Sequence, residues 1–397
     1  MEPRVGMTTR AGRQRTGGRS GRWKIAAATA MPSLVALTAI GALPQGAVAS
    51  TTTAAGVAYA KAQITAYEKV PAFVAPGRAF DARKLAGKLV FNIPQATSIP
   101  FLSIADTAMA AIAKRVGIRY TEYPTTGLTS DWVKGIDEAI AEKAGALSLN
   151  ALDPRLVGPE LAQAKSAGIP ATSEQFFDLG QTSARPSTLA AVRADNFAEA
   201  GRLEADWTIA DTGGRAHVLV VENKEQLSTV AMVDAITSEF AAHCPACTVT
   251  YLNVPATEWA TRIEPSVQAD LAQYPKLNYI IPIYDPMTQF VVPAITAAHK
   301  VGKIHIATFN GTPFALNLLE TGDIVRMDIG ENLNWLASAN MDEMMRTMLR
   351  LPSVANEHTA LRVFTKANVA QTGTPPKFNL GFGTAYVSGY DKLWGLG

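Results

Sequence analysis

Short apolar runs alternate with amphipathic stretches from residue 88 to residue 350, and this alternation restricts the fold more than any other feature of the chain. Most of the runs are continuously apolar, which is typical of strands that are buried on both faces of a parallel sheet. The strand-like runs are 88–94, 118–124, 146–150, 217–223, 248–253, 278–284, 304–310 and 324–330. Helical stretches separate them, at 102–116, 131–142, 157–167, 197–210, 226–242, 259–273, 287–300 and 333–350. The pattern predicts an α/β fold with doubly wound parallel sheets, and it supplies enough strands for two of them.

The first 49 residues have the parts of a secretory signal peptide. Basic residues come first, residues 25–43 are apolar and uncharged, and a motif of small residues ends at Ala49. We expect cleavage after Ala49, so that the mature protein begins at Ser50 and is periplasmic or secreted. An uncleaved membrane anchor is the alternative, because residues 25–43 are just long enough to span a bilayer. Residues 50–85 are interpreted as an N-terminal extension, a short helix followed by a linker that contains prolines.

Removal of the leader changes the charge balance. The leader, residues 1–49, holds seven of the 36 basic residues and one of the 34 acidic ones, which leaves 29 against 33 and a mature charge near −4. The basic character of the full chain therefore belongs to the leader, and we expect no nucleic-acid partner. The rest of the chain is longer than one hydrophobic core usually organises, so two domains are expected.

Cys244 and Cys247 are the only cysteines in the chain. A lone Cys-x-x-Cys pair serves as a redox-active dithiol, as half of a metal site or as a structural disulfide. The pair follows the predicted helix 226–242, so it lies at a helix C-terminus, where the dipole disfavours a thiolate. Metal binding needs further ligands, and the sequence offers neither a second cysteine pair nor paired histidines. We therefore expect a structural disulfide that contributes about 2 kcal/mol or less to stability.

Motifs of common enzyme classes are missing from the sequence. It contains no G-x-S-x-G, no H-E-x-x-H, no Walker loop and no G-x-G-x-x-G that follows a strand. The histidines have no metal-ligand spacing, and they are His217, His243, His299, His305 and His358. We predict no catalytic residue, no cofactor and no metal site, and a binding protein is favoured over an enzyme.

Several stretches between Lys88 and Leu351 have the order and spacing of a known family. They are "KLVFNIPQATSIPFLSIADTAMAAIAKRVGI", "GIDEAIAEKAGALSLNALDP", "ELAQAKSAGIP", "VRADNFAEAGRLEADW", "YDPMTQFVVPAITAAHKVGKIHIATFNGTP" and "IVRMDIGENLNW". The region that holds them resembles the ribose-binding-like, type I periplasmic substrate-binding proteins of sugar ABC transporters. The resemblance implies two α/β lobes that are joined by three crossovers and close on a ligand in the cleft between them. Ligands of open α/β sheets bind outside the carboxyl ends of the strands, which agrees with such a cleft.

The resemblance also implies a domain division and a function. It places residues 86–194 and 331–357 in lobe 1, and residues 195–330 and 358–397 in lobe 2. The implied function is capture of a small molecule, a sugar or a sugar-like compound, and its delivery to a membrane ABC permease by a monomer. A ligand-sensing receptor domain without a transport role is the alternative, followed by an exported enzyme on the same fold.

Site residues can be carried over from the family position by position. After the first strand such proteins place a polar residue and aromatic residues around a proline, and here "SIPFL" (98–102) keeps the proline. Gln175 and Phe176 stand where a ribose binder has an aspartate and an arginine, and Met232 stands where a second arginine is expected. The resulting candidates for ligand contact are Ser98, Phe101, Gln175, Phe176, Met232, Trp259, Tyr284, Asp285, Asn310 and Glu331.

The departures from the family pattern bear on the ligand. Each sugar hydroxyl in a dry cleft needs a hydrogen-bond partner, and charged aspartate and arginine partners make the strongest of these bonds. The chain lacks both arginines and has Phe176, Met232 and Tyr284 at such positions. This predicts a ligand less polar than a free pentose, such as a modified sugar or a compact aromatic compound. Phe101 and Trp259 are expected to face each other across the cleft and to hold the ligand's ring between them.

Overall fold

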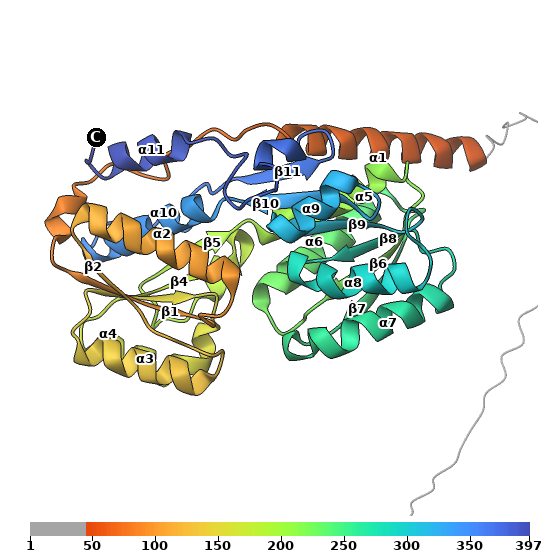
Figure 1. Ribbon diagram of the computed structural model, residues 1–397. Helices are drawn as coiled ribbons and strands as arrows, with labels where there is room; N and C mark the ends of the chain where they lie inside the picture. Colours follow the sequence, from red (N-terminus) through yellow and green to blue (C-terminus); the bar gives the residue numbers. More distant parts are fainter. Residues whose placement is uncertain (1–44) are drawn as a thin grey trace, which may run out of the picture. The chain divides into compact units, whose positions relative to one another are not determined.

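A computed structural model describes residues 45–397, which form two α/β lobes (Figure 1). The predicted leader lies outside the described residues as far as residue 44, and the predicted cleavage point after Ala49 falls within helix α1 (Gln45–Tyr67). In the described part of the chain, no helix is long and apolar enough to cross a membrane. The two lobes and the sheet in each confirm the predicted fold class.

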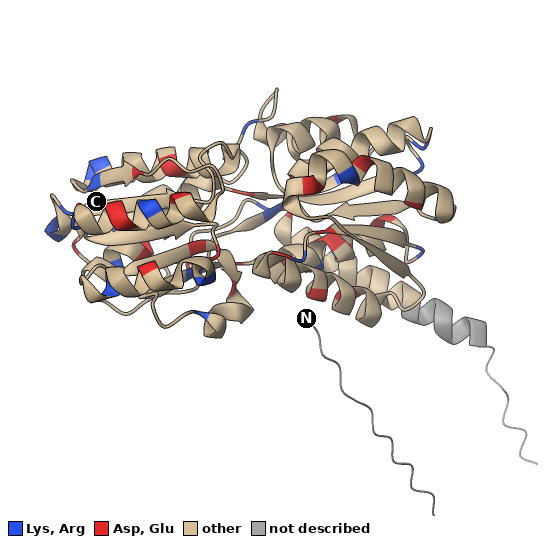
Figure 2. Ribbon diagram, turned by 90° about the horizontal axis from the view of Figure 1, so that it is seen from below, with Lys and Arg blue, Asp and Glu red and all other residues tan. Residues whose placement is uncertain are grey.

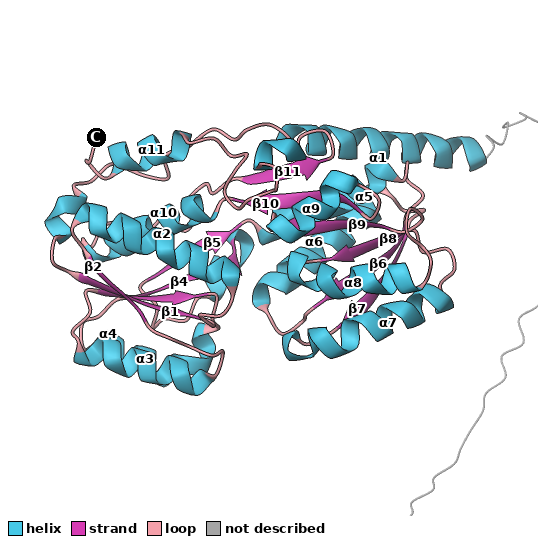
Figure 3. Ribbon diagram, viewed as in Figure 1, coloured by secondary structure: helices cyan, strands magenta, loops and turns pink. Residues whose placement is uncertain are grey.

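Lobe 1 is built on a five-stranded parallel sheet with the order β2-β1-β3-β4-β5. Its strands are β1 (Leu89–Pro94), β2 (Arg119–Glu122), β3 (Ala146–Asn150), β4 (Ala171–Asp178) and β5 (Ala191–Asp195). Figure 3 shows α2 (Pro100–Val116) and α10 (Leu333–Met348) on one face, and α3 (Thr129–Ala141) and α4 (Gly158–Ser166) on the other. Successive side chains of β1 point to opposite faces of the sheet. Phe91 packs in the hydrophobic cluster under α3, and Val90 packs in the cluster under α2 and α10.

Lobe 2 is built on a six-stranded sheet with the order β11-β10-β9-β8-β6-β7, in which β11 alone runs antiparallel to its neighbour. The strands are β6 (His217–Glu222), β7 (Thr248–Asn253), β8 (Tyr279–Pro282), β9 (His305–Asn310), β10 (Val325–Glu331) and β11 (Leu361–Thr365). The helices are α5 (Phe197–Asp211), α6 (Leu227–His243), α7 (Trp259–Gln273), α8 (Asp285–Ala297) and α9 (Pro313–Thr321). Short 3-10 helices lie at Ala82–Leu85, Pro154–Val157, Leu179–Ala184, Ala256–Glu258 and Val369–Thr372. Every predicted strand and helix is present, whereas β4, β5, β11, α9 and α11 (Ala385–Leu393) were not predicted.

The chain crosses between the lobes at three places in the hinge. The crossings are β5 to α5, β10 to α10, and the segment 349–360 that connects α10 to β11. The first and third crossings run side by side, because the N–H of Ala194 donates to the carbonyl oxygen of Ala355 and the side-chain amide of Asn196 donates to the carbonyl oxygen of Thr359. The three-crossover hinge that the family resemblance implied is therefore present.

Both ends of the described chain add further links between the lobes on the hinge side. Helix α1 packs on α5 and α6 of lobe 2, and the chain then runs to lobe 1, where Phe73 packs against Trp335 and Tyr390. In the other direction, the chain leaves β11 of lobe 2 and ends in α11, whose Tyr390 belongs to the hydrophobic cluster of lobe 1. The expected division, which placed 358–397 wholly in lobe 2, differs from the structure here, because apolar residues of α11 pack against α10. We call residues 68–81 the N-terminal strap.

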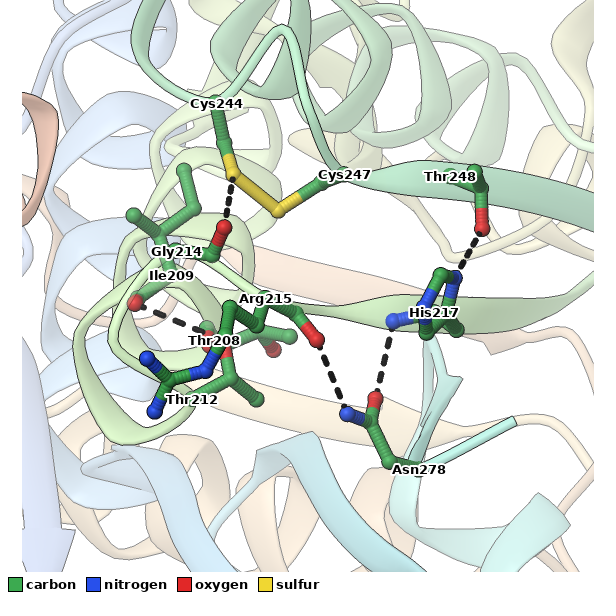
Figure 4. The surroundings of a disulfide bond; sticks show 10 residues. All are labelled: Thr208, Ile209, Thr212, Gly214, Arg215, His217, Cys244, Cys247, Thr248 and Asn278. Atoms are coloured by element: carbon green, nitrogen blue, oxygen red, sulfur yellow. Dashed lines mark hydrogen bonds between the residues drawn. A yellow bond between two sulfur atoms is a disulfide. The ribbon is translucent and has the colours of Figure 1, made fainter. Parts of the chain in front are cut away.

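The two cysteines form the predicted disulfide, which confirms its interpretation as a local brace (Figure 4). It links the end of α6 to the start of β7, and the Sγ of Cys244 lies 3.4 Å from the carbonyl oxygen of Gly214. The preceding residue, His243, stacks on Tyr59 of α1 with ring centroids 3.7 Å apart. The braced turn thus lies next to a residue that helps to hold α1 on lobe 2.

Candidate ligand-binding cleft

A cavity of about 660 Å³ lies between the lobes, at the carboxyl ends of the strands. Lobe 1 lines it with the loop after β1 and with the middle of β4, through Gln95, Ser98, Ile99, Pro100, Phe101, Leu102, Ala151, Gln175 and Phe176. Lobe 2 lines it with the starts of α5 to α9, through Phe197, Gln226, Ser228, Trp259, Tyr284, Pro286, Gln289, Asn310, Thr312, Pro313 and Phe314. Glu331 at the hinge and Phe378 from the C-terminal segment complete the lining. Parallel strands place their following loops at one edge, which explains why residues distant in sequence converge here.

Most of the residues predicted for the site line this cavity. They are Ser98, Phe101, Gln175, Phe176, Trp259, Tyr284, Asn310 and Glu331. Phe101 comes from lobe 1 and Trp259 from lobe 2, so both lobes present an aromatic ring to the same space. The indole N–H of Trp259 donates to the carbonyl oxygen of Val254 at 3.1 Å, which fixes the ring at the start of α7.

Met232 does not line the cavity, so its predicted position in the site is wrong. It lies on the buried face of α6 with Ile236 and Phe240, at the spacing of successive helical turns. That face packs against α5, where Gly201 approaches so closely that a Cβ would lie 2.4 Å from the carbonyl oxygen of Met232. Close packing between the two helices therefore directs Met232 into the core of lobe 2.

Asp285 also does not line the cavity, because it lies beneath the loop that does. Its Oδ1 accepts from the hydroxyl of Thr308 at 3.0 Å, and its Oδ2 accepts from the backbone N–H of Thr312 at 2.7 Å. Burial raises its pKa to about 6, and the hydrogen bonds from Thr312 oppose that rise. Asp285 therefore positions the loop Asn310–Thr312 rather than contacting the cavity itself.

A second buried carboxyl group, that of Asp328 on β10, holds the same loop. Its Oδ1 accepts from the backbone N–H of Gly311 at 3.0 Å, and burial together with the charge of Asp285 raises its pKa well above the usual value. Gly311 has a φ of +65°, and a Cβ there would lie 2.6 Å from the Cα of Gly330. Only glycine fits at this point, and Asn310 before it has a φ of 135°. The two acids thus fix an unusual backbone that presents Asn310 to the cavity.

Polar groups in the cavity differ in how far the protein already satisfies them. The hydroxyl of Tyr284 lies 3.2 Å from that of Ser228 and 3.4 Å from that of Thr229, and burial raises the pKa of Tyr284 to about 12. By contrast, within the described part of the chain, the amide oxygen of Gln175 is buried without a hydrogen-bond partner. The Gln175 amide is therefore available to a ligand, whereas the Tyr284 hydroxyl already has partners in the protein.

Glu331 is the single charged residue among those that line the cavity. Its side chain has no hydrogen-bond or ion-pair partner among the described residues, and only 6% of the residue is exposed. Burial raises its pKa well above the usual value; Asp195 acts in the same direction, and Arg193 acts against it. Figure 2 shows acidic and basic residues interspersed over both lobes, but among the described residues no lysine, arginine or histidine lines the cavity.

Sequence reasoning missed several cavity residues. Gln95 and Gln226 lie in loops that follow predicted strands, and that position alone is a usable signal for them. Phe197 follows β5, a strand that was not predicted, so its place could not be derived. Phe378 lies in the C-terminal segment, beyond the region of family resemblance, and no sequence signal connects it to the cleft.

Comparison with known proteins agrees with this geometry. Residues 90–346 match the family model described as a periplasmic binding protein domain. The chain belongs to this family. Members of the family are solute-binding proteins rather than enzymes. No curated protein matches the sequence.

Solved structures of periplasmic binding proteins share the fold. An ABC sugar transporter subunit from Rhodobacter sphaeroides is 18% identical, with a TM-score of 0.62 over 72% of this chain and 100% of that one. A solute-binding protein from Agrobacterium vitis with bound allitol is 20% identical, with a TM-score of 0.61 over 73% and 99%. A carbohydrate transporter from Acidothermus cellulolyticus in complex with myo-inositol is 18% identical, with a TM-score of 0.59 over 72% and 97%.

Proposed function

We propose that this chain is an exported solute-binding protein that captures a small sugar-like molecule between its lobes and delivers it to an ABC permease as a monomer. The observation that carries the proposal is the cavity between the lobes, to which the loops of both sheets contribute side chains. Its volume of about 660 Å³ is within the usual range for small-molecule sites. Membership of the periplasmic binding protein family supports the same function.

The lining indicates the ligand's chemistry. Aromatic rings from both lobes offer flat apolar surfaces, and a few amides and hydroxyls offer hydrogen bonds at their edges. A compact ring with apolar faces and a polar edge fits this arrangement better than an extended or strongly anionic molecule. Similar folds hold allitol and myo-inositol, which supports a polyhydroxylated ring or chain as the starting point.

A thermal-shift screen tests this proposal directly. The panel contains monosaccharides, deoxy sugars, amino sugars, polyols and small aromatic acids, each added to the mature protein. A ligand at one hundred times its Kd stabilises the fold by about 2.7 kcal/mol, which is easily detected as a rise in Tm. We expect a rise with at least one sugar or polyol, and a rise with aromatic acids alone would contradict the proposal.

Export is part of the same proposal. Cleavage after Ala49 would leave a mature protein that begins within α1 at Ser50. N-terminal sequencing of the exported protein is expected to read from Ser50, and a sequence that begins at Met1 would contradict a cleaved leader.

A further inference from the structure

The cleft contains one buried carboxyl group that the protein leaves unpaired. Glu331 ends β10, lines the cavity, and has no hydrogen-bond or ion-pair partner among the described residues. The next residue, Asn332, caps α10 by accepting from the backbone N–H of Trp335 at 2.9 Å. Glu331 is therefore fixed in place by the strand before it and the helix after it. A largely buried residue with an unpaired carboxyl group is costly, and this carboxyl group belongs to the lining of the cavity.

The charged groups around Glu331 do not neutralise the negative charge of its carboxylate. Arg193 on β5 forms an ion pair with Asp195, and its Nε donates to the side chain of Asn340 at 2.7 Å. That pair is close to neutral as a unit. Asp285, at the start of α8, adds a further negative charge.

The neighbouring strand β11 offers no counter-charge for Glu331 either. Its one arginine, Arg362, donates to the carbonyl oxygens of Glu68 and Gly381. The described groups that face Glu331 therefore leave it in a negative environment.

The remaining walls of the cavity favour a positive charge. Phe101, Trp259 and Tyr284 line the space, and aromatic faces attract cations. Phe176 lines it as well, but the guanidinium of Arg155 already lies over its ring, 5.8 Å from the centroid. Among the described residues, the lining contains no cation that would repel one or that would pair with an anionic ligand. A carboxyl group in an aromatic cavity is the arrangement that a protonated amine requires.

We propose that the ligand carries a protonated amino group that pairs with Glu331, and that its class is an amino sugar or an aminated polyol. This inference rests on the proposed function and specifies the substrate class of the same site. The amine donates to the Glu331 carboxylate, and the ring of the ligand lies between the aromatic residues of the two lobes. The amide of Gln175 and the side chain of Asn310 remain for the hydroxyls.

The pairing predicts a coupling between ligand binding and proton release. Burial raises the pKa of Glu331 well above the usual value, which favours the protonated form when no ligand is bound. An ammonium group favours the carboxylate instead, so up to one proton leaves the protein for each amine that binds. Affinity for an amine therefore rises with pH, by up to about tenfold per pH unit, until the amine itself loses its proton. A hydroxylated analogue leaves Glu331 protonated and shows no such dependence.

Calorimetric titration of matched ligand pairs tests this inference. The probes are glucosamine with glucose and galactosamine with galactose, measured from about pH 5 to about pH 8 and in two buffers of different ionisation enthalpy. We expect the amine of at least one pair to bind roughly tenfold to a hundredfold more tightly than the hydroxyl form, with release of a proton. Glu331→Gln keeps the shape of the side chain, and it should abolish both the affinity difference between the amine and hydroxyl forms of each pair and the release of a proton.

A matched variant distinguishes a direct contact between the amine and Glu331 from the effect of the protein's overall electrostatic field. Glu258→Gln removes one negative charge from the half-buried residue that precedes Trp259 and pairs with Arg262, and it should leave the amine preference intact. Hydroxyl forms that bind as tightly as their amines, or an amine preference that survives Glu331→Gln, would overturn the inference and leave the proposed function standing. Failure of every sugar and amino sugar to bind would contradict the proposed function as well.

Discussion

Asp328 shows how a buried acid can serve the cleft without reaching it. Its carboxyl group accepts a hydrogen bond from the backbone N–H of Gly311, and that of Asp285 accepts one from the next backbone N–H in the same loop, that of Thr312. Both acids are buried, and the charge of Asp285 raises the pKa of Asp328, whereas a hydrogen bond with Asp328 lowers the pKa of Asp285. The loop geometry that presents Asn310 is therefore maintained by a pair of groups that is costly to charge at neutral pH.

Asp328→Asn is expected to stabilise the protein at neutral pH. The amide keeps the acceptor for Gly311 and removes a group that the native state must keep protonated while the unfolded chain ionises it. We predict a gain in the free energy of unfolding at pH 7 and a much smaller gain at about pH 4, close to the usual aspartate pKa of about 3.9, where the unfolded chain also holds much of its proton. Urea denaturation of the variant and the parent protein at the two pH values measures both differences in the free energy of unfolding. Asp328→Ala is the control, since it loses the acceptor and should be less stable than Asp328→Asn by about 1–3 kcal/mol.

At the residue scale, the family resemblance was the signal that worked for the site. Asn310 and Trp259 were carried over from the family resemblance; Asn310 ends β9 and Trp259 follows β7, and both line the cavity. Met232 and Asp285 failed because helix packing and loop hydrogen bonds direct their side chains away from the cavity. Both effects depend on partners that are distant in sequence, such as Gly201 and Thr312, and no local pattern reveals them.

At the element scale, β4 and β5 were missed because their buried residues are polar. Glu174 on β4 accepts from the hydroxyls of Ser148 and Thr172, and Arg193 on β5 pairs with Asp195. A search for apolar runs cannot find strands whose buried polar side chains form hydrogen bonds and ion pairs with one another. The apolar parallel strands and the helices between them were predictable from the sequence. Their local pattern of apolar residues indicates which side chains are buried.

The disulfide braces the turn between α6 and β7, and its removal is expected to have a small effect. Its loop is short, so replacement of both Cys244 and Cys247 by serine should lower the free energy of unfolding by about 2 kcal/mol or less. Ligand affinity should stay nearly constant, because the turn lies at the end of α6 away from the cavity. Denaturation and calorimetry of the double variant measure the two effects. Complete loss of binding would show that the pair has a role beyond the brace.

The N-terminal strap and α11 make a close contact that a double-mutant cycle can isolate. Gly389 is inside α11, where alanine normally gains about 1 kcal/mol over glycine. A Cβ at Gly389 would lie 2.2 Å from the ring of Phe73, so Gly389→Ala should destabilise the protein instead. In a Phe73→Ala background the same substitution should become neutral or stabilising, as chemical denaturation of the four proteins would show. Equal effects in both backgrounds would mean that the strap does not pack on α11 in this way.

At the scale of the whole molecule, buried acids set the dependence of stability on pH. Burial raises the pKa of Asp106 and Glu174 to about 7 and that of Asp206 to about 8. Burial likewise raises the pKa of Glu204 and Glu357 well above the usual value. A group with a raised native pKa binds a proton that the unfolded chain releases, so its contribution to stability is lost as pH rises through the native pKa.

The protein is therefore expected to become more stable as pH falls from about 8 to about 5. His305, whose pKa burial lowers, acts in the opposite direction but is outnumbered by the acids. Thermal unfolding across this range should show Tm rising toward acid pH. A Tm that stays flat, or that falls below neutral pH, would contradict the protonation states assigned to the buried acids.

The lobes already touch at one side of the cleft, at Leu227. Gln181 of lobe 1 donates to the carbonyl oxygen of Leu227 in lobe 2 at 2.9 Å, and Leu227 packs against the hydrophobic cluster of lobe 1. A ligand that contacts both lobes binds this arrangement preferentially and shifts the hinge equilibrium toward it. We therefore propose that one ligand molecule contacts both lobes at once.

Calorimetry of the best ligand against Phe101→Ala and Trp259→Ala tests that claim most directly. Tyr274→Ala is the matched control, since Tyr274 is exposed just beyond the end of α7 opposite to Trp259. Each cleft variant removes one aromatic face, so we predict a loss of affinity of about tenfold or more for both, and no change for the control. A cleft variant that binds as tightly as the parent protein would contradict the account.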